Sequence, residues 1–115
     1  MWLWSIAALV ALAPVDATAA GHEAEVEAFA HIMADVRTAA ERCPDLSIDW
    51  TAVNAEKERL RIADVDYFAF RKKAHDLASS IEDGLGDDHA VTTWCADVVA
   101  RYGPRGSTAA GLLHR

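Results

Sequence analysis

The sequence contains little cysteine, glycine or proline, with two, six and three of these residues in 115. It has no glycine-rich phosphate loop, no haem-attachment Cys-x-x-Cys-His and no zinc-protease His-Glu-x-x-His. Cys43 and Cys95 are too far apart in sequence to form a Cys-x-x-Cys redox motif. Ser79, Ser80 and Ser107 lack the neighbours of an activated nucleophile. We therefore predict no catalytic residues and no cofactor, and we expect a protein that is not an enzyme.

Basic residues are also scarce. The chain has 11 Lys and Arg against 18 Asp and Glu, which gives a formal net charge of −7 with histidine neutral. Binding to the phosphate backbone of nucleic acids needs clustered Lys and Arg, so we predict no nucleic-acid partner. An acidic surface also favours solubility, so the charge identifies neither a protein partner nor an oligomeric state.

The sequence has no apolar run long enough to span a bilayer. Residues 2–13 are mostly apolar, but Pro14 and Asp16 interrupt the run well short of the roughly 20 residues that a transmembrane helix needs. The small residues Ala17-Thr18-Ala19-Ala20 follow and suit a signal peptidase. We predict that residues 1–20 are a signal peptide and that the protein is periplasmic or secreted. A membrane anchor is the alternative, because this segment lacks Lys and Arg.

The rest of the chain has the apolar spacing of helices rather than the alternation of strands. Helices are predicted over residues 23–42, 50–61, 65–83 and 89–102. Aspartates are expected to cap the last three helices, and glycines to end the third: Asp49, Asp64, either Asp87 or Asp88, and Gly84 with Gly86. We expect the first to bury Val26, Phe29, Ala30, Met33, Val36 and Ala40, and we place Trp50 and Trp94 in the core. The fold class is therefore all-α, with a small four-helix domain at 21–104. Residues 105–115 are predicted to be a flexible C-terminal tail, unless Leu112 and Leu113 fold back on the bundle.

The two cysteines are predicted to form a disulfide. Pro44 ends the first helix next to Cys43, whereas Cys95 lies within the fourth helix. In an oxidising compartment, a disulfide is the expected state of two such cysteines. The bond would join the end of the first helix to the middle of the fourth.

Two histidines are candidate metal ligands. Glu27, His31 and Asp35 share one face of the first helix, but we interpret this row as surface decoration. If cleavage follows Ala19, His22 becomes the third residue of the mature chain. An amino-terminal amine, two amide nitrogens and that imidazole could then bind Cu(II) or Ni(II) in a square plane, whereas cleavage one residue later would remove the site.

Several features together resemble known exported proteins. The predicted signal peptide, the acidic helical body and the pair Cys43 and Cys95 resemble the HdeA-type periplasmic acid-stress chaperones. Other segments resemble a group of small exported bacterial proteins without an assigned activity: Cys43-Pro44-Asp45-Leu46, Trp94-Cys95, Tyr102-Gly103-Pro104-Arg105-Gly106 and Gly111-Leu112-Leu113. The first resemblance implies a disulfide-held helical domain that protects client proteins in acid.

We therefore expect a small exported binding protein, in which acid neutralises the carboxylates, loosens the helices and exposes apolar faces. A constitutive protein-interaction module is the alternative, and it needs no loosening.

Overall fold

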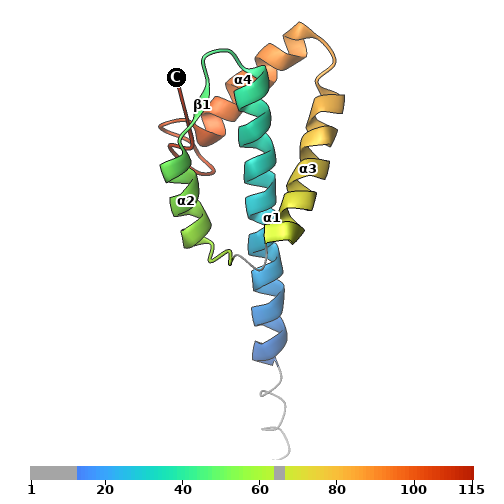
Figure 1. Ribbon diagram of the computed structural model, residues 1–115, viewed down its shortest axis with the longest axis vertical. Coiled ribbons are helices and arrows are strands. Elements are labelled where there is room, and N and C mark those ends of the chain that lie inside the picture. The colour runs from blue at the N-terminus through green and yellow to red at the C-terminus, as the bar shows by residue number, and fades with distance from the viewer. Residues whose placement is uncertain (1–12, 64–66) are drawn as a thin grey trace, which may run out of the picture.

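The computed structural model describes residues 13–63 and 67–115. In chain order the elements are α1 (Ala13–Arg42), β1 (Ser47–Ile48), α2 (Trp50–Arg59), α3 (Tyr67–Gly84), α4 (Asp88–Tyr102) and β2 (Leu113–His114). Figure 1 shows α1 in the middle, α2 and α3 on either side, and α4 running obliquely across the C-terminal end of α1. The predicted all-α architecture is confirmed, with four helices in the described residues.

The helix α1 is longer than predicted and begins at Ala13 rather than near residue 23. Pro14 is compatible with this start, because the first helical turn does not use its backbone N–H groups. The first turns of α1 project beyond the other helices (Figure 1). The apolar run at 2–12 lies outside the described residues, so the signal peptide remains a prediction. None of the described helices combines the length and hydrophobicity of a membrane span.

The buried face of α1 is wider than the predicted stripe. Phe29, Met33 and Val36 are buried as expected, but Ala40 is exposed and Ala39 is fully buried instead. The reason is that α1 contacts α3, α4 and β1, so more than one side of it is covered. A single apolar stripe is typical of a helix that packs against one neighbour, whereas α1 packs against three elements.

Local sequence signals set several helix ends. The Asp49 carboxylate accepts a hydrogen bond from the Ala52 N–H at 3.1 Å, and the Asp87 carboxylate accepts one from the Ala90 N–H at 2.8 Å. Asp49 is the predicted N-terminal cap of α2, and Asp87 is one of the two predicted candidates for the cap of α4. The last residue of α3 is Gly84, one residue beyond the predicted end at 83. The predicted cap Asp64 lies outside the described residues.

Trp50 does not belong to the core, contrary to the prediction. It is the first residue of α2 and is 52% exposed, whereas Val53 on the same helix is 3% exposed. Trp94 is partly buried and packs against the core. Helical spacing places Trp50 near the apolar side of α2, but at the first position of the helix only about half of its surface is covered.

The C-terminal segment corrects the prediction of a flexible tail. Leu112 and Leu113 are buried, and β2 pairs with β1 in antiparallel register, Ser47 with His114 and Ile48 with Leu113. The chain turns tightly at Gly106, where a Cβ atom would lie 2.3 Å from the Arg101 carbonyl oxygen. The alternative, in which the two leucines fold back on the bundle, is the one observed. Two-residue strands are too short for a periodic sequence signal.

A disulfide joins Cys43 to Cys95, as predicted, across a sequence separation of 52 residues. Cys43 is buried and directly follows α1, whereas Cys95 lies within α4. Because β1 follows only four residues after Cys43, the disulfide and the small sheet fasten the same end of α1.

Candidate binding site

The row Glu27, His31 and Asp35 on α1 does not act as one unit. Glu27 and His31 are exposed, with 3.9 Å between Glu27 Oε1 and His31 Nε2, and Glu27 also pairs with Lys73 at 3.4 Å. Asp35 instead points into the domain, and its side chain is 13% exposed. No group of three or more potential metal ligands occurs among the described residues. Surface decoration is therefore right for the first two residues and wrong for Asp35.

Asp35 connects α1 to α4 through one carboxylate oxygen. Its Oδ2 accepts hydrogen bonds from Arg101 Nη1 at 2.8 Å and from the Tyr102 hydroxyl at 2.6 Å. Arg101 also pairs with Asp97 at 3.1 Å, and its guanidinium lies 5.3 Å from the centre of the Tyr102 ring. The cluster compensates a partly buried charge and fixes the orientation of α4 on α1.

We expect Asp35→Asn to lower the free energy of unfolding by about 2 kcal/mol, because the amide cannot neutralise the partly buried Arg101 guanidinium. Glu27→Gln is a matched control on the same helix. It removes only a half-exposed ion pair and should cost less than about 0.5 kcal/mol. Urea denaturation of both variants measures the difference, and equal losses would contradict the role given to Asp35.

Tyr102 has an unusual ionisation. Burial and the hydrogen bond to Asp35 raise the pKa of the Tyr102 hydroxyl well above its ordinary value. The pKa of Tyr102 is higher in the folded than in the unfolded chain. The neutral hydroxyl therefore stabilises the fold fully below the unfolded pKa of about 10, and this contribution is lost as the pH rises further.

The titration of Tyr102 can be measured in a variant that has no other tyrosine. Tyr67→Phe leaves Tyr102 as the single tyrosine, because the chain contains two. We expect the tyrosinate absorbance of this variant to appear at higher pH in buffer than in urea. Identical titrations would contradict the burial of this hydroxyl.

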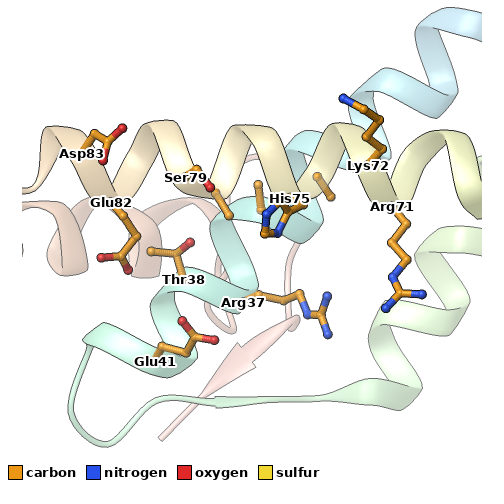
Figure 2. Close-up of a pocket in the computed structure, with 12 residues that line it drawn as sticks. Arg37, Thr38, Glu41, Arg71, Lys72, His75, Ser79, Glu82 and Asp83 are labelled. Carbon is orange, nitrogen blue, oxygen red and sulfur yellow. The ribbon is translucent and has the colours of Figure 1, made fainter.

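A groove of about 840 Å³ runs between α1 and α3. Its charged side chains are acidic at one end and basic at the other (Figure 2): Glu41, Glu82 and Asp83, then Arg37, Arg71 and Lys72. His75 and Ser79 of α3 lie between these ends, with no hydrogen bond between their side chains among the described contacts. The groove therefore presents a charge gradient but no activated nucleophile.

A second cavity, which we call the Trp50 cleft, has a volume of about 260 Å³ and lies between α1, α2 and α3. Its floor consists of buried apolar side chains: Phe29, Met33, Val53, Phe70 and Ala74. The Phe29 and Phe70 rings meet edge to face, with 5.3 Å between their centres. Polar and charged groups surround this floor together with Trp50: Arg37, Asn54, Lys57 and Arg71.

His22 lies within α1, and its side chain is outside the described part of the structure. The amino-terminal metal site requires cleavage after Ala19, so it stays a prediction. Mass spectrometry of the mature terminus followed by copper titration tests it, and a terminus at Gly21 would end the hypothesis.

Comparison with known proteins does not assign a function to these sites. No family model, curated protein or solved structure matches the chain. Any function assigned to the candidate site must therefore be argued from the geometry of the site itself. Sequence patterns missed the Trp50 cleft because its three walls come from separate helices, and the exposure of Trp50 depends on how α2 packs.

Proposed function

We propose that this chain is a small exported binding protein that protects client proteins in acid, in the manner of the HdeA-type chaperones. The observation that carries the proposal is the number of carboxylates and the position of three of them. Three described ion pairs connect α1 to another helix, and each needs a charged carboxylate: Glu27 with Lys73, Glu82 with Arg42, and Asp35 with Arg101. A protonated carboxyl group carries no charge, so strong acid removes all three.

The change in total charge acts in the same direction. Without residues 1–20, which include Asp16, 17 of the 18 acidic residues remain with all 11 Lys and Arg and five histidines. The charge would therefore change from about −6 at neutral pH to about +16 when every carboxyl group is protonated. Repulsion of this size favours expanded states. The exposed ion pairs are individually weak, so the charge reversal is the larger effect.

Helix α3 carries a further acid-sensitive contact. Lys72 Nζ donates a hydrogen bond of 2.9 Å to Asp76 Oδ2, and this bond holds the pKa of Asp76 below its ordinary value. Since the folded-state pKa is the lower one, the pair stabilises α3 above the ordinary carboxyl range. That contribution is lost as the pH falls through the lowered value.

The fastened end of α1 determines which faces acid would expose. The disulfide and the β1–β2 pair hold α4 and the C-terminal segment to this end, whereas no disulfide holds α2 or α3. We expect α2 and α3 to separate from α1 first. That movement would uncover the floor of the Trp50 cleft, including Phe29, Met33 and Phe70.

Dye binding and circular dichroism between pH 7 and about pH 2 test the loosening. The oxidised chain should bind a hydrophobic dye in acid, lose its near-ultraviolet signal and keep most of its helical signal. Added salt should shift the transition to lower pH, because it screens the repulsion. A chain that binds no dye down to pH 2 would contradict the proposal.

A constitutive interaction module is the second candidate, and the exposure of Trp50 favours it. A 52% exposed tryptophan beside an apolar cleft is available to a partner without any loosening. This function predicts binding at pH 7 that Trp50→Ala weakens. The acid-stress function instead predicts client protection that appears only in acid.

A further inference from the structure

We propose that the groove between α1 and α3 binds a small zwitterion, a molecule that carries a primary ammonium group and a carboxylate at opposite ends of a short chain. The binding would occur in the folded protein at neutral pH. It is therefore separate from the acid-stress function, which requires the helices to loosen.

The Thr38 side chain is the feature of the groove that indicates a ligand. Thr38 belongs to α1, lines the groove and is 2% exposed. Figure 2 shows its side chain pointing across the groove toward α3. A helical threonine can donate a hydrogen bond to the carbonyl oxygen four residues earlier, as Thr92 does to Asp88 at 2.9 Å. The described residues form no hydrogen bond with the Thr38 hydroxyl, so its oxygen is available to a bound group.

Carboxylates surround this hydroxyl. Figure 2 shows Glu82 of α3 and Glu41 of α1 on either side of Thr38. Glu41 forms no ion pair with the described residues, and the Glu82 carboxylate pairs with Arg42 at 3.7 Å, which is longer than a hydrogen bond. A primary ammonium group has three N–H donors, enough for the Thr38 oxygen and both carboxylates. The described residues contain no group of three potential metal ligands, so an organic cation suits this end better than a metal ion.

Arg37 supplies the positive charge at the other end of the groove. Although Arg37 and Glu41 are four residues apart on α1, no ion pair of Arg37 occurs in the described part of the chain. Figure 2 shows the Arg37 guanidinium pointing away from Glu41, toward the end of the groove where Arg71 lies. Arg71 makes other contacts, so we assign the anionic group to Arg37 alone. A guanidinium binds a carboxylate through two parallel N–H groups. Charge complementarity therefore selects a ligand with both charges.

The floor of the groove determines the chain between the two charges. Ala34, Ala74 and Ala78 line the groove, and these small side chains leave room for methylene groups. Arg37 and Glu41 are separated by about 6 Å along the helix axis, and the Arg37 side chain extends further away. An α-amino acid carries both charges on one carbon and cannot reach both ends. An extended ω-amino acid, such as 6-aminohexanoate, separates them by a flexible apolar chain.

The test uses the full oxidised chain at pH 7 and low ionic strength, with 6-aminohexanoate as the probe. Its isomer 2-aminohexanoate carries both charges at one end, whereas hexanoate lacks the ammonium group and hexylamine lacks the carboxylate. Backbone amide signals in NMR spectra report binding. We expect saturable shifts at Thr38 and Glu41, and dissociation constants for the three comparison ligands at least about tenfold higher than for the probe.

Thr38→Val tests the buried hydroxyl, because valine has a similar shape without the oxygen. The variant should raise the dissociation constant of 6-aminohexanoate by about tenfold. Since it removes a buried oxygen that has no partner in the described chain, it should leave the thermal midpoint unchanged or raise it. Thr93→Val makes the same change at an exposed position of α4 outside the groove and should leave the dissociation constant unchanged.

Two glutamate variants separate the proposed contact from general charge. Glu41→Gln should raise the dissociation constant of the probe by about tenfold, whereas Glu58→Gln, at an exposed position of α2 outside the groove, should leave it unchanged. Absence of saturable binding, equal affinity for 2-aminohexanoate, or equal effects within either pair of variants would each overturn the proposal. A lower thermal midpoint for Thr38→Val would also overturn it, because the hydroxyl would then already have a partner in the protein. None of these outcomes would affect the acid-stress function, which is measured at low pH.

Discussion

Replacing Cys95 by serine should lower the free energy of unfolding by about 4 kcal/mol, the value for a loop of this length in the chain-entropy model. The bond joins residues 52 apart, so the reduced unfolded chain gains much conformational freedom. For a domain of about 100 residues this loss corresponds to a thermal midpoint about 15–30 °C lower. Calorimetry or thermal circular dichroism of the wild type and the variant measures it.

Two controls separate the crosslink from the side chain. The double variant Cys43→Ser/Cys95→Ser should match the single variant, and a reductant should destabilise only the wild type. Ala96→Ser makes a comparable change at an exposed neighbour in α4 and should cost less than about 1 kcal/mol. An unchanged midpoint for Cys95→Ser, or free thiols in the purified protein, would contradict the assignment.

Replacing Leu113 by alanine should lower the free energy of unfolding by about 3 kcal/mol. The Leu113 side chain is fully buried in β2, although it lies only two residues from the C-terminus. Its removal leaves a cavity in the core cluster that includes Phe29 and Tyr102. Urea denaturation measures the loss.

His114→Ala is the matched control for Leu113→Ala. His114 is the next residue of β2 and its side chain is exposed, so the substitution should change stability by less than about 0.5 kcal/mol. If both variants were equally stable, the C-terminal segment would not be part of the core.

The sequence was sufficient to predict features that depend on neighbouring residues. Asp49 and Asp87 cap helices because each carboxylate reaches an N–H three residues later, and Gly84 ends α3. The disulfide was also predictable, because the chain has only two cysteines and a signal-like start. Such signals require no knowledge of how the helices pack.

Features that depend on packing were not predictable. Asp35 has the spacing of a surface residue. Its inward hydrogen bonds depend on Arg101 and Tyr102, which lie 66 and 67 residues further along the chain. The sequence could only offer the burial of Leu113 as an alternative, because that burial requires β1 as a partner from the other half of the chain. The spacing of apolar residues identifies the apolar side of a helix, but it does not predict how many other elements pack against that helix.

These limits also explain why the candidate site could not be predicted. Phe29, Trp50 and Phe70 belong to three helices, and each fits an ordinary apolar pattern by itself. The folded chain places two of them in the floor of a cleft and leaves the third exposed beside it. The basic residues around this floor are likewise dispersed in sequence, at 37, 57 and 71.

Client protection as a function of pH is the most direct test of the acid-stress function. The full oxidised chain is mixed with an aggregation-prone protein at pH 7 and at about pH 2, and light scattering follows aggregation. We expect the chain to suppress aggregation at about pH 2 and to have little effect at pH 7, because only acid uncovers its apolar faces. Dye binding in acid without protection of the client, or equal protection at both pH values, would contradict the proposed function.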